Sequence, residues 1–189
     1  ELPDENLKII LGAYGGKFDF YTLKGGIEAL LARCGVKEYS VAPADDRPAY
    51  HPGRCATLSA GGKEIGVFGQ IHPAVAENYG IEEAVFAADL DVAALSAAVA
   101  PEESYKPLPK FPAVTRDLAL LCDVDLPVAE LDRAIRAGAG RLLETLTLFD
   151  VYTGAQIPEG KKSVAYSLTL RSAEGTLTEA EIERTTAMV

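Results

Sequence analysis

The spacing of apolar and polar residues changes several times along the first half of the chain. Phe20–Cys34 carries apolar residues at helical spacing, and Gly35 follows as a stop signal, so the pattern predicts a helix. The pair Gly61-Gly62 separates two short segments with strand character, which predicts a tight hairpin. The remaining expected elements are strands at Leu7–Tyr14, Glu38–Val41, Ala56–Ala60, Glu64–Gln70 and Ala84–Leu90, and short helices at Pro73–Tyr79 and from Asp91 to Ala98.

Two details of this first half predict how its elements pack. Leu7–Tyr14 is an apolar run, which is compatible with a buried strand. Gly25-Gly26 lies inside the predicted helix, where each glycine lowers helix stability by about 1 kcal/mol. We therefore expect another backbone to approach the helix closely at these two glycines.

The second half follows the order strand, helix, strand, strand, helix. The strands are predicted at Thr115–Cys122, Glu144–Tyr152 and Lys162–Arg171, and the first helix runs from Pro127 to about Ala139. Thr178 caps the last helix and forms a capping box with Glu181. These are the first five elements of the six in a ferredoxin-like unit. We expect a truncated ferredoxin-like domain, because the chain ends at Val189, and its first strand should be an exposed edge.

A proline-rich segment separates the two halves. Pro101, Pro107, Pro109 and Pro112 restrict the backbone and remove hydrogen-bond donors, which favours an extended linker. We predict one domain at residues 1–99, a linker at 100–109 and a second domain at 110–189. Each domain mixes helices with antiparallel strands, so the predicted fold class is α+β.

Composition and charge narrow the possible functions. The chain has 189 residues, 48% of them apolar, and none of its apolar runs approaches the ~18 residues that span a bilayer. Its three cysteines show no paired spacing, which indicates reduced thiols in a cytoplasmic protein. The net charge of −10 argues against nucleic-acid binding. The acidic excess lies in the first half, however: residues 1–105 hold 8 Lys and Arg and 16 Asp and Glu, whereas residues 106–189 hold 10 Lys and Arg and 12 Asp and Glu. The second half is therefore nearly neutral and permits a local basic surface.

No catalytic or metal-binding motif stands out. His51 and His72 each precede a proline and lack further ligands at metal-binding spacing. The glycines near Gly12 lack the spacing and the lysine of a phosphate-binding loop, and there is no Gly-x-Ser-x-Gly sequence. We expect the chain alone to be non-catalytic, with no catalytic residue and no metal site.

One face of the sheet in the second domain could bind RNA. Two helices should cover one face and leave the other open, lined by Asp117, Ala119, Ser167, Thr169 and Arg171. Open sheets of this type bind single-stranded RNA, although usually through aromatic stacking, and here only Phe149 could join the face, depending on register. A solvated face, or one packed against a neighbouring domain, explains the same pattern. Basic residues lie near this face, and each is open to two interpretations, a phosphate contact or a solvated surface charge. They are Lys110, Arg116, Lys161, Lys162 and Arg171.

Several phrases of the sequence resemble one protein family. Lys110-Phe111-Pro112-Ala113-Val114-Thr115-Arg116-Asp117, Leu148-Phe149-Asp150-Val151-Tyr152 and Ser167-Leu168-Thr169-Leu170-Arg171-Ser172 occur in that order. Together they resemble the ferredoxin-fold anticodon-binding domain at the end of the β subunit of bacterial phenylalanyl-tRNA synthetase. His51-Pro52-Gly53-Arg54-Cys55-Ala56 and Ile65-Gly66-Val67-Phe68-Gly69-Gln70-Ile71-His72-Pro73 resemble the later part of the catalytic-like domain of the same subunit. The resemblance implies that the first domain is class II synthetase-like without an active site.

The resemblance also implies a function. The fragment would belong to phenylalanine–tRNA ligase, contact the α subunit in an (αβ)₂ enzyme and bind tRNA(Phe) near the anticodon, with neither DNA nor membrane as a partner. ATP and magnesium would be used by the complete enzyme and not bound by this fragment. The expected RNA-binding residues are Lys110, Arg116, Asp117, Ser167, Thr169 and Arg171. The alternatives are a protein-interaction module whose sheet face is buried, and part of a single-chain organellar phenylalanyl-tRNA synthetase.

Overall fold

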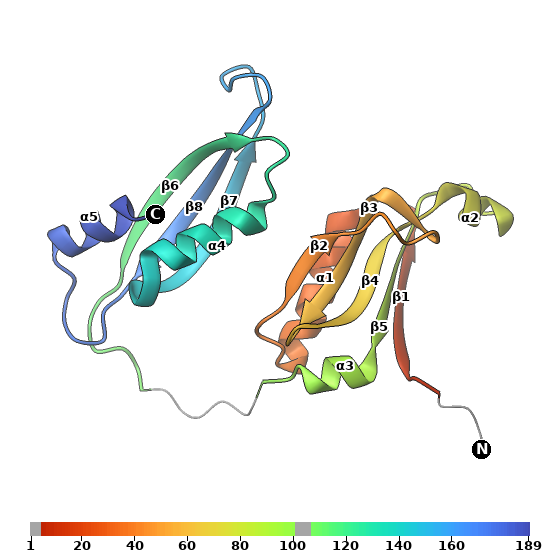
Figure 1. Ribbon diagram of the computed structural model, residues 1–189, viewed down its shortest axis with the longest axis horizontal. Coiled ribbons are helices and arrows are strands. Elements are labelled where there is room, and N and C mark those ends of the chain that lie inside the picture. Colours follow the sequence, from red (N-terminus) through yellow and green to blue (C-terminus); the bar gives the residue numbers. More distant parts are fainter. Residues whose placement is uncertain (1–4, 101–106) are drawn as a thin grey trace. The chain divides into compact units, whose positions relative to one another are not determined.

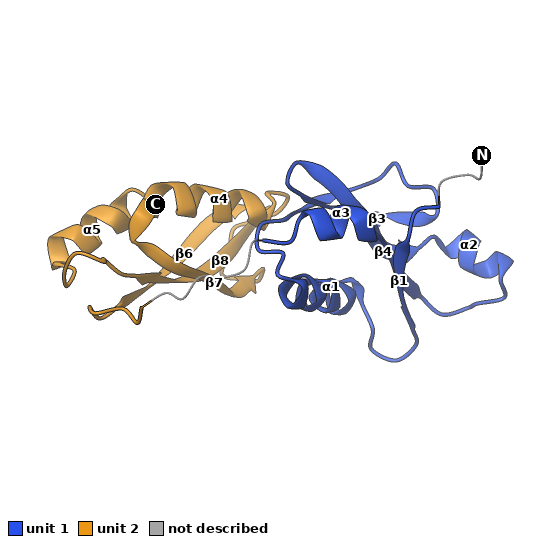
Figure 2. Ribbon diagram, turned by 90° about the horizontal axis from the view of Figure 1, so that it is seen from below, with its two compact units in different colours: residues 1–104 blue, residues 105–189 orange. Residues whose placement is uncertain are grey.

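The computed structural model describes residues 5–100 and 107–189. The chain divides into two compact units, unit 1 at residues 1–104 and unit 2 at residues 105–189 (Figure 2). Of the linker predicted at 100–109, residues 101–106 lie outside the described residues. Both units combine helices with one antiparallel sheet, which confirms the predicted α+β fold class.

Unit 1 contains a five-stranded antiparallel sheet in the order β1-β5-β4-β3-β2 (Figure 1). The hairpin of β3 and β4 turns at Gly61 and Gly62, whose φ angles of 58° and 76° fit glycine, as the sequence predicted. The strands are β1 Lys8–Tyr14, β2 Ser40–Pro43, β3 Tyr50–Ala60, β4 Lys63–Ile71 and β5 Val85–Asp91, and the helices are α1 Phe20–Cys34, α2 Pro73–Asn78 and α3 Val92–Ala97.

Helix α1 has the predicted bounds, because its ends are set by local signals. The Asp19 side chain accepts a hydrogen bond from the Thr22 amide at 2.7 Å, and Gly35 ends the helix with a φ of 80°. The buried stripe consists of Leu23, Ile27 and Leu31, which join the core of unit 1. Each such burial stabilises the fold by about 1.5–3 kcal/mol.

Two packing predictions for unit 1 are wrong. Strand β1 is the edge of the sheet, and one of its faces is exposed, with Ile10 and Tyr14 at 64% and 72% exposure. It is therefore only half-buried, because no helix covers that face in the described residues. A Cβ added at Gly25 or Gly26 would meet no atom within 4 Å in the described part of the chain, so no backbone approaches α1 there.

Unit 2 contains a three-stranded antiparallel sheet in the order β6-β8-β7. This is the order of the first, third and second strands of a ferredoxin-like unit, and β6 is an edge, as expected. The strands are β6 Val114–Asp123, β7 Leu143–Tyr152 and β8 Lys161–Leu170, and the helices are α4 Val128–Ala139, the 3₁₀ turn η1 Gly140–Leu142 and α5 Glu179–Ala187. The capping box of Thr178 and Glu181 is present at the start of α5, as predicted.

The core of unit 2 lies between the sheet and its two helices. Val164, Tyr166, Leu168 and Leu170 of β8 are almost completely buried, and they pack with Ile135 of α4 and with α5. Both helices therefore cover the same face of the sheet (Figure 2). None of the helices in the described parts of the two units is long and apolar enough to cross a membrane.

Candidate RNA-binding surface

The uncovered face of the unit 2 sheet is defined by strict alternation in burial. In β8, Val164, Tyr166, Leu168 and Leu170 point to the helices, while the residues between them are half-buried on the other face. Strand β6 alternates in the same way between half-buried and exposed residues. We call the uncovered side the open face.

The pairing register places twelve residues on the open face in four rows across the strands. Each row joins one residue of β6, one of β8 and one of β7. The rows are Thr115, Thr169 and Thr145; Asp117, Ser167 and Thr147; Ala119, Ala165 and Asp150; and Leu121, Ser163 and Tyr152. The face is polar and small at one end, and apolar and aromatic at the other.

A β-bulge in β7 brings Asp150 and Tyr152 onto this face. The register shifts between Leu148 and Asp150, so Phe149 is an extra residue in the strand and is 58% exposed. Before the bulge the odd-numbered residues lie on the open face, and after it the even-numbered ones do. Asp150 and Tyr152 were not among the predicted open-face residues, because unbroken alternation assigns them to the helix side. The sequence does contain one sign of the bulge: Asp150 is charged, although alternation from Leu146 and Leu148 predicts an apolar residue at this position.

The loop after β7 packs closely against Tyr152. A Cβ at Gly154 would lie 2.2 Å from the Tyr152 hydroxyl oxygen, so a larger residue at this position would require the Tyr152 ring to shift. Tyr152 remains 43% exposed. The end of the ring thus lies against the loop, while part of its surface stays accessible.

The charge on the open face is acidic at its centre. Asp117 and Asp150 are exposed and form no ion pair with any described residue. Lys161 lies at the far end of β8, where its Nζ pairs with the Asp123 carboxylate at 2.7 Å. A phosphate would be repelled from the middle of the face, whereas donor groups on a base would find carboxylate acceptors there.

The predicted site residues fall into two groups. Asp117, Ser167 and Thr169 lie on the open face, as expected. Lys110 is exposed just before β6 and forms no ion pair within the described residues. Arg171 follows β8, donating from Nε to Glu144 at 2.9 Å and from Nη1 to the Phe111 carbonyl at 2.5 Å.

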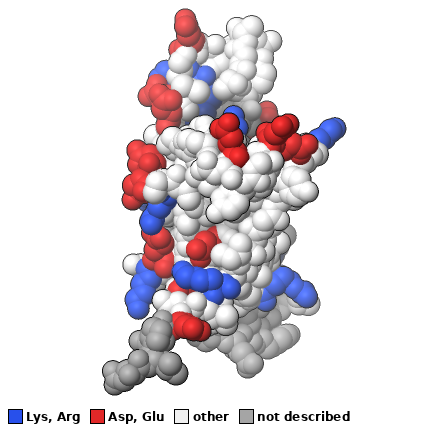
Figure 3. Space-filling model, turned by 90° about the vertical axis from the view of Figure 1, so that its right-hand side faces the viewer, with Lys and Arg blue, Asp and Glu red and all other residues white. Residues whose placement is uncertain are grey.

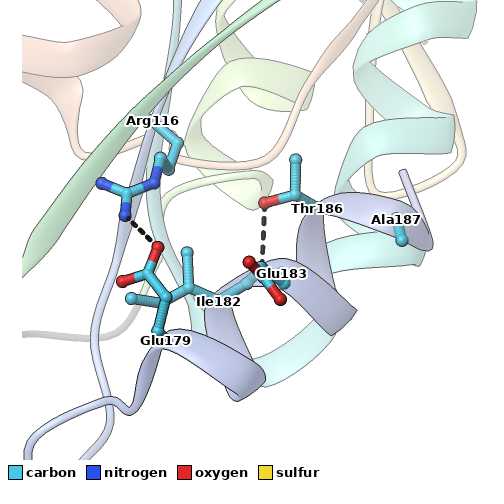
Figure 4. A pocket seen from close by; sticks show the side chains of 6 residues that line it. All are labelled: Arg116, Glu179, Ile182, Glu183, Thr186 and Ala187. Carbon is cyan, nitrogen blue, oxygen red and sulfur yellow. Dashed lines mark hydrogen bonds and ion pairs between the residues drawn. The ribbon is translucent and has the colours of Figure 1, made fainter.

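Arg116, expected among the basic residues near the open face, lies on the opposite side of the sheet. It pairs in register with Leu168, which is 1% exposed on the helix side. Its Nη2 donates to Glu179 of α5 at 3.0 Å. Both side chains line a shallow, open hollow of about 370 Å³ between β6 and α5 (Figure 4). The parity of β6 separates Arg116 from Asp117, because adjacent residues in a strand point to opposite faces.

Lys162 is also unsuited to contact phosphate. It is only 9% exposed, and its Nζ donates to the carbonyls of Val124 and Leu126 at 2.9 and 2.6 Å. The ammonium group thus satisfies backbone acceptors in the turn before α4.

The described residues do not fit a magnesium site. Across residues 5–100 and 107–189, no group of three or more His, Cys, Asp and Glu side chains could hold a metal ion. His72 caps α2 by accepting from the Ala74 amide at 3.2 Å, and His51 accepts from the Gly53 amide at 3.1 Å. Both histidines therefore have local structural roles.

Unit 2 is by its architecture an open-faced α+β sandwich, with both helices on one face of its sheet; some modules with such a sheet bind RNA on it. Two family models match the chain: residues 109–189 match the ferredoxin-fold anticodon binding domain, and residues 1–92 match the phenylalanyl tRNA synthetase beta chain CLM domain. The chain belongs to the phenylalanyl-tRNA synthetase β-chain family, which confirms the resemblance seen in the sequence.

Curated relatives carry the same assignment. The phenylalanine–tRNA ligase beta subunits of Clostridium acetobutylicum and Clostridium tetani are 42% and 43% identical over 97% of this chain. That of Symbiobacterium thermophilum is 43% identical, also over 97%. The chain spans only 22–23% of the length of these relatives.

Proposed function

We propose that the chain is the part of a phenylalanyl-tRNA synthetase that holds tRNA(Phe) near its anticodon, with the open face of unit 2 as the binding surface. The observation that carries the proposal is the row of Tyr152, Ser163 and Leu121 beside Asp150 on a sheet with helices only on its other face. The match of this unit to an anticodon-binding family supports the same reading.

The chemistry of the open face favours unpaired bases over the phosphate backbone. An exposed aromatic ring such as Tyr152 can stack on a base, and one stacked base contributes about 1–3 kcal/mol. The carboxylates of Asp150 and Asp117 accept hydrogen bonds from base amino and imino groups. Ser163, Ser167 and Thr169 offer hydroxyl groups that both donate and accept.

We propose that the phosphate groups of the RNA contact basic residues at the ends of the open-face strands. Lys110 is the exposed cation nearest in sequence to the first open-face strand, and Arg171 retains guanidinium donors beyond its two contacts. Arg116 stays a candidate only for a phosphate that reaches the edge beside α5.

The test is binding of the chain to an anticodon stem-loop of tRNA(Phe), measured by fluorescence anisotropy. Tyr152→Ala should weaken binding by about 5–150-fold, the equivalent of one lost stacked base. Asp150→Asn should weaken it by about tenfold or more and reduce discrimination between anticodon sequences. Lys110→Ala should lower the affinity for all sequences alike and reduce the salt dependence.

Val151→Ala is the matched control. Val151 is 46% exposed, neighbours Tyr152 in the same strand and pairs with Val164 on the helix side. Its loss should leave RNA affinity unchanged. Equal effects at Val151 and Tyr152, or no binding of the stem-loop, would favour the alternative of a protein-interaction module.

The wider function extends from the family. We propose that the chain acts within an (αβ)₂ enzyme in the cytoplasm, that unit 1 contacts the α subunit, and that the complete enzyme uses ATP and magnesium to attach phenylalanine to its tRNA. Support comes from the names of the relatives and from the match of unit 1 to the β-chain domain. Co-purification of tagged α subunit with the chain, and its loss on deletion of unit 1, would test the subunit contact.

A further inference from the structure

The charge of the chain makes the placement of individual RNA contacts important. The net charge is −10, and on the face of the molecule that Figure 3 shows, Lys and Arg side chains are interspersed with Asp and Glu side chains. Proteins that bind RNA without precise contacts do so mainly by neutralising its phosphates with basic residues, and an acidic chain gains little from this attraction. Affinity for an RNA base must therefore come from side chains in a defined position, such as the ring of Tyr152.

Gly154 lies against the end of the Tyr152 ring. A Cβ built on Gly154 would overlap the hydroxyl oxygen and Cζ of Tyr152 and would lie 3.0 Å from its Cε1. Gly154 does not have a positive φ, so its backbone conformation is open to other residues. The ring alone takes the space that a Cβ would need, and a residue other than glycine forces either the ring or the loop to move.

The loop that carries Gly154 is braced by hydrogen bonds near both of its ends. The Ile157 amide donates to the Gly154 carbonyl at 2.8 Å and closes a turn directly after β7. At the other end, the Val124 amide donates to the Gly160 carbonyl at 2.9 Å and ties the loop to the turn that follows β6. Moving the loop away from the ring would disturb these bonds, which carries a cost in stability.

The Tyr152 ring yields more easily than the loop. The atoms that lie nearest to Gly154 are at the far end of the side chain, and Tyr152 is 43% exposed. Exposed side chains change between staggered rotamers within picoseconds to nanoseconds, so the ring has other positions within reach. An alanine at position 154 would therefore displace the ring and leave the loop and the sheet in place.

We propose that Gly154 is a positioning residue of the RNA-binding surface, because its missing side chain lets the Tyr152 ring lie against the loop in the position in which the ring stacks on a base. This inference rests on the proposed function of the open face. Contact with the loop restricts the ring before RNA arrives, so less conformational freedom is lost on binding. Gly154 acts through Tyr152, and its effect on RNA affinity disappears when the ring is absent.

Binding of the chain to the anticodon stem-loop of tRNA(Phe), measured by fluorescence anisotropy, tests the proposal with Gly154→Ala, Tyr152→Ala and the double variant. Gly154→Ala should weaken binding by about 5–150-fold, and by no more than Tyr152→Ala does. The double variant should lose no more affinity than Tyr152→Ala alone, because the two residues act as one unit. An unchanged affinity in Gly154→Ala, or full additivity of the two losses, overturns the proposal.

Gly175→Ala is the matched control. A Cβ at Gly175 meets no atom within 4 Å in the described residues, so this variant should keep its affinity within about twofold. Hydrogen exchange of the β8 amides should likewise stay within about twofold of the original chain in both glycine variants. Exchange that is about tenfold faster in Gly154→Ala alone would mean that the fold yields in place of the ring, and it overturns the proposal.

Failure of this inference and failure of the proposed function give different results. If Tyr152→Ala weakens binding and Gly154→Ala does not, only the role of Gly154 is overturned. If the original chain does not bind the stem-loop, or Tyr152→Ala binds it equally well, the proposed function of the open face fails and the role of Gly154 fails with it. In the chain without RNA, a nuclear Overhauser effect is expected between the Tyr152 ring and the Gly154 Hα protons, and its absence overturns the contact itself.

Discussion

Tyr166 provides the sharpest test of the packing in unit 2. Its side chain has 0% exposure, and its hydroxyl donates to Asp132 of α4 at 2.6 Å and lies 3.4 Å from the Val128 carbonyl. Tyr166→Phe removes the donor and leaves the ring in place. A hydrogen bond to a charged acceptor contributes about 1.5–3 kcal/mol, but Asp132 is only half-buried and can bind water instead. We therefore expect a loss of about 1–2 kcal/mol.

The same side chain should make unit 2 sensitive to alkali. Burial, and then the hydrogen bond and negative charge of Asp132, raise the pKa of Tyr166 above its ordinary value. The buried Tyr166 hydroxyl stabilises the fold fully below the pKa of tyrosine in the unfolded state, about 10. This stabilisation is lost as pH rises from there towards the higher pKa of Tyr166 in the folded state. Stability should fall above about pH 10 by up to ~1.4 kcal/mol per pH unit from this group, and that component should be absent in Tyr166→Phe.

Hydrogen exchange of the β8 amides measures both effects, because it reports the opening of unit 2 separately from unit 1. Tyr152→Phe is the control, since its hydroxyl lies on a 43% exposed residue of the open face. It should change stability by no more than about 0.5 kcal/mol. Equal losses of stability in Tyr166→Phe and Tyr152→Phe, or an unchanged alkaline slope in Tyr166→Phe, would contradict the role assigned to the Tyr166 hydroxyl.

Four further substitutions test three separate features. Gly69→Ala should destabilise unit 1 by about 2 kcal/mol or more in urea unfolding, because a Cβ there lies 2.3 Å from the Arg54 carbonyl oxygen. Gly25→Ala, the control, should stabilise unit 1 by about 0.5–1 kcal/mol. Equal effects of the two substitutions would contradict the close approach of the Arg54 backbone to Gly69. Thr178→Ala should weaken α5 by about 0.5–2 kcal/mol and speed its amide exchange, and unchanged exchange would argue against the cap. Arg116→Ala should cost about 1 kcal/mol or less and leave stem-loop affinity within about twofold, while a tenfold loss would return Arg116 to the RNA-binding surface.

Features set by neighbouring residues could be predicted from the sequence. Helix α1 depends on Asp19, its apolar stripe and Gly35, and its bounds were predicted correctly. The Asp91 cap, the Gly61-Gly62 turn and the three strands of unit 2 agree with expectation for the same reason. Short-range steric and hydrogen-bonding preferences decide these features.

Features that depend on which strand or backbone lies beside an element in the fold could not be predicted in this way. The apolar run of β1 reads like a central strand, and only the sheet order shows that it is an edge. Gly25 and Gly26 weaken α1 without any close backbone contact in the described residues, and we have no packing explanation for them. The positions of Asp150 and Tyr152 depended on a bulge that alternation alone does not reveal.

The irregularities of β7 also determine how this domain can change in evolution. Glu144 and Phe149 are the residues at which the register of β7 shifts, so each can be gained or lost while the residues on both sides keep their faces. Strand β8 pairs with β6 over ten residues without interruption, and one inserted residue there would exchange the buried core with the open face. Related sequences should therefore vary in length at Glu144 and Phe149 but remain constant in length from Lys161 to Leu170.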